Sequence, residues 1–408
     1  MSLMCIAVAT AYLLLAPSPS AGADFHGFDP ATFDGLMLPP ATLQAMAAEA
    51  AQKSPPQNGE FLVFGFANLQ RDISFGIKVE KSIERNAKAA GIELLIADNR
   101  LDGPTALANA ESFARRRTDF VIEFQTDVNF GPAIMQHFNR KEIGVVAIDI
   151  PMPGATYFGA NNPRSGFMGG SYLAQAAQVR FGDRALKEGY LVVGELPQSG
   201  AIPAMRTEGQ IAGFLAVLPA FPRERIIRID TKNTLQYSFQ QMSNALGRIP
   251  AGAPILLTAI NDQSVTGMLR AVQQKGRAGD VIVVGKGADE IQTMVAEETF
   301  VASVAYFPER YGNYLIPLAL MRLAGHAAPL AVSVAHVMVT PANICQFYPE
   351  YECQGSPSFD YVFPQEAFIA HLQTLQDDPE LADYRQLIPD HQQAVVNPCL
   401  ASAGSLAT

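Results

Sequence analysis

Short runs of consecutive apolar residues alternate with amphipathic segments from residue 60 to about residue 340. Continuous apolar runs are typical of strands buried on both faces, and apolar positions three and four residues apart are typical of helices. In the first half of this region the pattern predicts strands at 61–66, 92–97, 120–124 and 143–148, and helices at 73–90, 106–117 and 132–140.

A second set of the same kind follows. It predicts strands at 191–193, 226–229, 255–260, 281–284 and 301–307, and helices at 207–218, 237–246, 263–274 and 311–323. Gly325 directly follows the last helix and is a helix-ending signal. Strands that alternate with helices predict parallel sheets covered by helices on both faces. The fold class is therefore α/β, with two similar Rossmann-like lobes, each a doubly wound parallel sheet, and a cleft between them.

The segments outside this alternation are less regular. Residues 24–59 are expected to form an N-terminal extension and linker with one helix at 41–53, and residues 346–408 an irregular C-terminal tail with one helix near 366–376. Two segments that contain glycine lie close together, Gly159-Ala160-Asn161-Asn162 and residues 166–170. They lack the spacing of a dinucleotide-binding loop after the first strand, so we interpret them as easing a chain crossover between the lobes.

The first 23 residues have the pattern of a cleaved signal peptide. An apolar run at 3–15 is too short to span a bilayer, and Ala21-Gly22-Ala23 forms a small-residue cleavage site. The run lacks a basic residue before it, so a buried amphipathic helix is the alternative. The signal peptide predicts export to the periplasm as a soluble protein.

Composition restricts the possible partners. Of the 408 residues 49% are hydrophobic and 17% charged, which indicates a folded globular protein. The formal net charge of −10 argues against binding to nucleic acid and to anionic membrane surfaces.

Cysteine usage fits an oxidising compartment. Cys5 lies in the signal peptide, and Cys345 and Cys353 bracket a short loop in which a local disulfide is plausible. Cys399 is then free, or it pairs with either of the other two. The spacing of these cysteines does not match a zinc site.

Catalytic patterns are absent from the sequence. The six histidines are scattered, and neither a metalloprotease helix motif nor a nucleophile elbow occurs. We therefore expect a protein that is not an enzyme and that needs no cofactor or metal.

Several short motifs resemble those of the ribose- and galactose-type periplasmic binding proteins. They are Phe75 at a helix start, Gly91 before the second strand, Asp149 at a strand end, Gly213-Phe214 in a helix, Asn261-Asp262 and Val284-Gly285. Their order over about 280 residues carries the resemblance. LacI-type repressors share the fold but would need a basic headpiece where this chain has a signal peptide.

The resemblance implies a periplasmic binding protein type I fold, in which two lobes joined by a three-crossover hinge close on a small ligand. It divides the chain into a first lobe of 60–162 plus 307–330 and a second lobe of 163–306 plus 331–345, with crossovers near 161–165, 306–309 and 328–336. A monomer that works with an inner-membrane transporter or receptor is expected.

Ligands of open parallel sheets bind outside the carboxyl ends of the strands, so the residues after each strand are the candidate contacts. The candidate ligand-binding residues are Phe75, Asp149, Ile150, Arg206, Gln210, Asn261, Asp262, Gly287 and Tyr306.

Several of these positions depart from the sugar-binding pattern. Ile150, Gln210, Gly287 and Tyr306 stand where sugar-binding relatives keep charged or polar contacts, and the chain has no Trp. A buried sugar hydroxyl without a partner costs about 1–3 kcal/mol. The sequence therefore favours a ligand less polar than a sugar, such as a sterol or hopanoid. The alternatives are a monosaccharide or polyol bound for an ABC importer, and a sensor that presents its ligand to a receptor.

Overall fold

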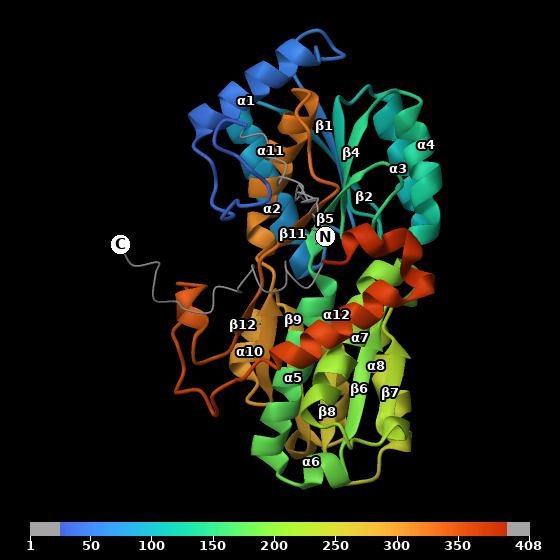
Figure 1. Ribbon diagram of the computed structural model, residues 1–408, viewed down its shortest axis with the longest axis vertical. Coiled ribbons are helices and arrows are strands. Elements are labelled where there is room, and N and C mark those ends of the chain that lie inside the picture. The colour runs from blue at the N-terminus through green and yellow to red at the C-terminus, as the bar shows by residue number, and fades with distance from the viewer. Residues whose placement is uncertain (1–24, 390–408) are drawn as a thin grey trace, which may run out of the picture.

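The computed structural model describes residues 25–389. It contains two six-stranded sheets, one in each of two lobes that lie one above the other in Figure 1. The first sheet is parallel throughout and has the order β11-β5-β4-β3-β1-β2. Its strands are β1 (Val63–Asn68), β2 (Glu93–Asp98), β3 (Phe120–Glu123), β4 (Gly144–Ile148), β5 (Thr156–Ala160) and β11 (Ala331–Val334).

The second sheet has the order β12-β10-β9-β8-β6-β7, and its edge strand β12 is antiparallel to β10. Its strands are β6 (Tyr190–Glu195), β7 (Ile226–Asp230), β8 (Ile255–Ala259), β9 (Val281–Gly287), β10 (Phe300–Ala305) and β12 (Val337–Val339). The predicted two-lobed, doubly wound α/β fold is confirmed.

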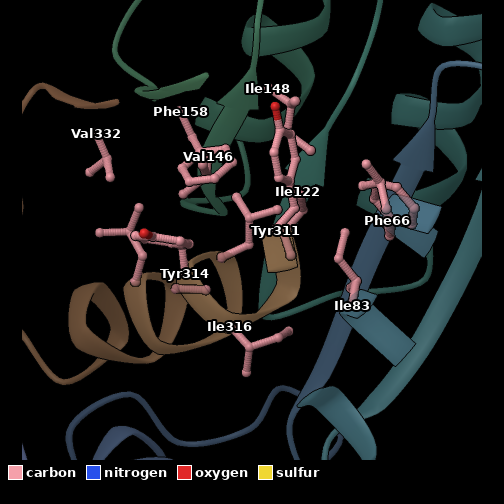
Figure 2. Close-up of a cluster of buried hydrophobic side chains, with 14 of the residues drawn as sticks. Phe66, Ile83, Ile122, Val146, Ile148, Phe158, Tyr311, Tyr314, Ile316 and Val332 are labelled. Carbon is pink, nitrogen blue, oxygen red and sulfur yellow. The ribbon is translucent and has the colours of Figure 1, made fainter. Parts of the chain in front are cut away.

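Helices cover both faces of the first sheet because its strands are apolar on both sides. On one face lie α1 (Pro40–Lys53), α2 (Ser74–Ala90) and α11 (Tyr311–Leu323), and on the other lie α3 (Gly103–Arg115) and α4 (Gly131–Asn139). Figure 2 shows strand side chains meeting Tyr311 and Tyr314 of α11 in the first of these layers. The rings of Phe158 and Tyr311 lie 4.9 Å apart there.

The second sheet is covered in the same way. One face packs against α5 (Asn162–Phe181) and α7 (Ala201–Val217), and the other against α8 (Leu235–Ala245), α9 (Asp262–Gln274) and α10 (Ile291–Ala296). A single-turn helix, α6 (Arg184–Lys187), leads from α5 to β6.

The chain crosses between the sheets three times. The crossings lie between β5 and α5 at residue 161, between β10 and α11 at 306–310, and between β11 and β12 at 335–336. The boundary predicted at residue 331 is wrong, because β11 pairs with β5 and belongs to the first sheet. Both strands that flank the third crossing are short and apolar, so the pattern could not show which sheet each one joins.

The second glycine cluster is not a crossover loop. Residues 162–181 form the long helix α5, which the sequence analysis missed. A Cβ atom at Gly166 or Gly170 would overlap backbone carbonyls of Arg206 and Gln210, and one at Gly213 would overlap Phe167. The glycines therefore allow close packing of α5 against α7, a role that helix propensity does not signal.

The N-terminal extension is part of the first lobe. Phe25 and Phe28 are buried, and α1 packs between α2 and α11. The signal-peptide prediction (residues 1–23) and Cys399 lie outside the described residues. Within the described residues, no helix has the length and apolar character needed to cross a membrane.

The C-terminal region is more ordered than the predicted irregular tail. A disulfide joins Cys345 and Cys353, and α12 (Gln365–Asp377) packs across α7. Its buried side chains Phe368 and Leu372 share a cluster with Tyr157 of the first sheet and Met205 of α7. The tail thus contacts both lobes, through apolar positions too few for the sequence pattern to reveal.

We predict that Phe368→Ala lowers the free energy of unfolding by about 3–5 kcal/mol, as expected for a large ring removed from a packed site. Phe368 is fully buried, and its ring lies 5.3 Å from that of Phe167. Urea denaturation measures the change. Thr374→Ala, at an exposed position of the same helix, is the control and should change stability by less than about 0.5 kcal/mol. Equal effects of the two variants would contradict a structural role for the tail.

A buried carboxyl at the end of β3 predicts a pH dependence of stability. Glu123 Oε1 accepts a hydrogen bond from Asn99 Nδ2 at 2.8 Å, and Oε2 has no hydrogen-bond partner within residues 25–389. Burial raises the pKa of Glu123 to about 8. From about pH 4.5 to about pH 8 the folded state therefore holds a proton that the unfolded state has released, so stability falls as pH rises through this window.

Glu123→Gln should remove this contribution, because the amide oxygen still accepts from Asn99 and carries no charge. The free energy of unfolding of the wild type should fall relative to the variant by on the order of 1 kcal/mol per pH unit. Denaturant titrations at several pH values test this. A constant difference between wild type and variant from pH 5 to pH 8 would show that Glu123 titrates normally.

Candidate functional site

A cavity lies between the two sheets, where the carboxyl ends of their strands face each other. The first lobe contributes Leu69, Ile73, Phe75, Phe124, Thr126, Asp149 and Ile150, and the second lobe and its crossover contribute Leu196, Ser199, Pro203, Arg206, Asn233, Ile260, Asn261, Lys286 and Tyr306. Six of the nine predicted ligand-binding residues are in this lining, and three are not.

Asp149 and Arg206 face each other across the cavity from opposite lobes. Asp149 follows β4 with a positive φ of 59°, a conformation that costs energy and recurs at functional sites. Its Oδ1 lies 4.0 Å from Arg206 Nη2, too far for a hydrogen bond. Burial raises the pKa of Asp149, and the nearby guanidinium opposes that shift.

Arg206 is held in place by the second lobe. Its Nε donates to Asn162 Oδ1 at 2.8 Å and its Nη1 to the carbonyl of Ile260 at 2.9 Å. The guanidinium lies 5.1 Å from the centre of the Tyr306 ring, whose hydroxyl donates to Ser165 Oγ. With Nε and Nη1 occupied, the Nη2 group is the part of the guanidinium turned toward Asp149 and the cavity.

Two asparagines lie side by side on the second lobe. Asn261 Oδ1 caps α9 by accepting from the backbone of Ser264, and its Nδ2 donates to Asn233 Oδ1 at 2.7 Å. Asn261 thus both caps α9 and lines the cavity. Asn233 follows β7, and the sequence analysis missed it because it did not inspect that strand's end.

Lys286 is a second cation in the lining. It lies at the end of β9 and is fully buried, and among the residues that the structure describes its Nζ has no hydrogen-bond partner. Burial and the nearby Arg206 hold the pKa of Lys286 well below its usual value. Lys286 is not among the predicted contacts, which include the next residue, Gly287, instead.

The first lobe supplies a mainly apolar wall. Phe75, at the start of α2, lies edge-on to Phe124 and Tyr311, with ring centres 6.1 and 5.6 Å apart. Ile150 is buried beside Asp149. Phe124 and Thr126 follow β3 and were not singled out in the sequence, because aromatic residues beside strands are usually core.

Three predicted contacts have structural roles instead. Gln210 donates from Nε2 to the carbonyl of Ala259 at 2.7 Å. Asp262 accepts from Ser303 Oγ at 2.8 Å and from the backbone N–H of Asp289 at 3.1 Å. Gly287 has a φ of 115° and no side chain to offer. These residues hold the strand ends of the second lobe together and lie outside the cavity lining.

The two lobes also touch at the rim of the cavity. Ser74 Oγ of α2 donates to Glu290 Oε1 at 2.8 Å, and Lys78 Nζ donates to the carbonyl of Asp289 at 3.2 Å. The structure is therefore in a closed arrangement.

The cavity is small. Its volume is about 60 Å³, room for roughly four to six water molecules at ~10–15 Å³ each on this measure. Such waters occupy on the order of 120–180 Å³ in the liquid, which is the scale of a monosaccharide and well below that of a tetracyclic sterol. The described residues contain no cluster of His, Cys, Asp and Glu able to hold a metal ion.

Comparison with known proteins agrees with the fold. Residues 64–327 match the model of a periplasmic binding protein domain. Ribose import binding protein RbsB of Bacillus subtilis is 23% identical over 281 residues, covering 66% of this chain and 86% of that protein. The Escherichia coli protein of the same name is 24% identical over 242 residues, covering 58% and 77%.

Solved structures share the architecture. A protein from Mycobacterium smegmatis in complex with β-D-fucofuranose superposes with a TM-score of 0.60 at 20% identity, covering 71% of this chain and 94% of that one. An ABC transporter solute-binding protein from Bacillus halodurans with bound myo-inositol gives 0.58 at 19%, covering 71% and 98%. The fold, the cavity at the strand ends and the domain match over residues 64–327 together show that this chain belongs to the periplasmic binding protein family.

Proposed function

We propose that this protein captures a small polyhydroxylated solute, a monosaccharide or polyol, in the cavity between its lobes and delivers it to an ABC importer. The site of action is the periplasm, and the role is binding rather than catalysis. The observation that carries the proposal is the pair of Asp149 and Arg206, which face each other from opposite lobes at 4.0 Å without a direct hydrogen bond.

A hydroxyl group fits between these two side chains. With Asp149 Oδ1 and Arg206 Nη2 separated by 4.0 Å, one oxygen atom can lie about 2.8 Å from both. The hydroxyl then donates to the carboxylate and accepts from the guanidinium, which are both charge-assisted bonds. Because the two partners come from different lobes, a bound hydroxyl also holds the lobes together.

The other polar groups of the lining extend this pattern. Thr126 Oγ1 is buried and finds no hydrogen-bond partner in the described part of the chain. Ser199, Asn233 and Asn261 also line the cavity. The ring of Phe75 offers an apolar face to the carbon side of a sugar. The relatives' names support the same class of solute, since they include ribose import binding proteins and structures with bound D-allose and myo-inositol.

The expected sterol or hopanoid is not supported. That expectation counted apolar replacements at Ile150 and Gly287 but missed the polar groups of Lys286, Asn233 and Thr126, which come from other positions of the cavity wall. A cavity of about 60 Å³ would also have to expand severalfold to hold a sterol.

We predict that Arg206→Met weakens binding of the preferred solute by about 10- to 100-fold, since it removes a hydrogen bond between charged and polar groups. Isothermal titration calorimetry with ribose, allose, galactose, glucose, tagatose and myo-inositol identifies the preferred solute and measures the change. Asp149→Asn should also weaken binding, because its amide keeps the shape and loses the charge.

Arg116→Met, at an exposed position of the first lobe, is the control and should bind as the wild type does. Binding of the preferred solute that is unchanged in both Arg206→Met and Asp149→Asn would place the solute elsewhere. If no sugar or polyol binds the folded wild type, the proposed function is wrong.

The rim contact predicts a shift between open and closed forms. Glu290→Ala removes the acceptor of the Ser74 hydrogen bond, so the ligand-free protein should have a larger radius of gyration by small-angle scattering. Solute affinity should fall by about 2- to 10-fold although Glu290 does not line the cavity. Glu224→Ala, exposed on the second lobe, is the control. If the radius of gyration of Glu290→Ala equals that of the wild type, this contact has no role in closure.

A further inference from the structure

We propose that the solute carries an anionic group, a carboxylate or a phosphate, and that Lys286 binds this group at the second-lobe wall of the cavity. This inference rests on the proposed function and narrows its solute class to sugar acids or sugar phosphates. Nothing in a neutral sugar requires a buried ammonium group at this position.

Lys286 lines the cavity, and the fold leaves room beside α5 for its ammonium group. Along β9 its side chain alternates with Gly285 and Gly287 and lies on the same face as Val284, toward α5. A Cβ atom at Gly169 of α5 would overlap Nζ. Glycine at position 169 thus leaves the space that the end of the lysine side chain occupies.

The protein itself offers this ammonium group no partner. Lys286 is 0% exposed, and Nζ makes no hydrogen bond within the described residues. The nearest buried carboxylate in electrostatic reach, Asp262, is already engaged by Ser303 Oγ and the backbone N–H of Asp289. A buried cation without a counter-charge is costly, so its retention in a cavity wall indicates that a partner arrives with the ligand.

The cavity lining has more basic than acidic residues. Arg206 and Lys286 are the cationic residues of the lining, and Asp149 is its one acidic residue. Asp149 already faces Arg206 at 4.0 Å. An anionic ligand would supply the counter-charge that Lys286 lacks, and the hydroxyl between Asp149 and Arg206 would remain in place.

A neutral lysine that accepts a hydrogen bond from a sugar hydroxyl is the competing explanation. It predicts tight binding of neutral sugars and little gain from a carboxylate or phosphate. The two explanations also differ in proton balance, because the pKa of Lys286 lies well below its usual value in the free protein. Binding of an anion should raise that pKa and so take up a proton.

The test compares matched solutes by calorimetry: galactose with galacturonate, galactonate and galactose 6-phosphate, and the same set for glucose, ribose and allose. We expect an acidic member to bind at least about tenfold more tightly than its neutral parent. Titrations at a series of pH values in buffers of different ionisation enthalpy should show a pH range in which that solute takes up a proton. The sugar acids and the sugar phosphates form separate arms, so the result also says which anion is recognised.

Lys286→Met should abolish both the preference for the acidic member and the proton uptake. Gly169→Ala is a second variant that keeps the charge and displaces Nζ, and it should reduce the same preference. Asp149→Asn should weaken both members of a pair alike, because it acts on the shared hydroxyl.

The outcomes separate the two proposals. If a neutral parent binds as tightly as its acidic members, or if the preference survives in Lys286→Met, the inference is overturned and the proposed function stands. If neither neutral nor acidic solutes bind the folded wild type, both are overturned.

Discussion

The architecture depends on one constraint, which is that three short connections must carry the chain between two parallel sheets at nearly the same place. Residue 161, residues 306–310 and residues 335–336 make these crossings. Because strands of a parallel sheet end at one edge, the crossings turn the carboxyl ends of both sheets toward each other. Polar side chains on both edges then face a common cavity, where charges from the two lobes lie close together.

Close packing of α5 against α7 places the cationic side of this cavity. Glycines at positions 166, 170 and 213 remove the side chains that would keep the two helices apart. Arg206 on α7 can then reach Asn162 at the start of α5, and the Tyr306 hydroxyl can reach Ser165. Close backbone packing of the two helices thus helps to fix the orientation of the guanidinium, so the entropic cost of ordering it is paid during folding.

The regions outside the family match add to this scaffold. The N-terminal extension covers α2 and α11 of the first lobe, with α1 in the same core as the sheet. The C-terminal helix α12 packs on α7 and shares its apolar cluster with Tyr157 of the first sheet. Both segments bury apolar area that would otherwise be exposed, and the second one contacts both lobes, so it must accommodate or resist their movement.

The local pattern of the sequence was sufficient for most elements and for the class of fold, because apolar runs and helical spacing report burial directly. It also located Asp149, Arg206, Asn261 and Tyr306, since residues after strands are close to the cavity in any fold of this kind. Whether these residues touch a ligand depends on packing between distant segments. Asp262 and Gln210 have polar side chains at strand-end or helix positions, yet they bond to the protein itself.

Only the tertiary structure decided the chemistry of the cavity. The polarity lost at Ile150 and Gly287 is supplied by Lys286, which precedes Gly287 on β9, and by Asn233, which lies in the turn after β7. Which of these side chains reach the cavity is set by the assembly of the two sheets. The same holds for the glycines of α5, which read as a flexible crossover until α7 is placed against them. Side-chain character is local, but the partner that each side chain meets is set by long-range contacts, so the sequence alone determined the fold class and not the ligand class.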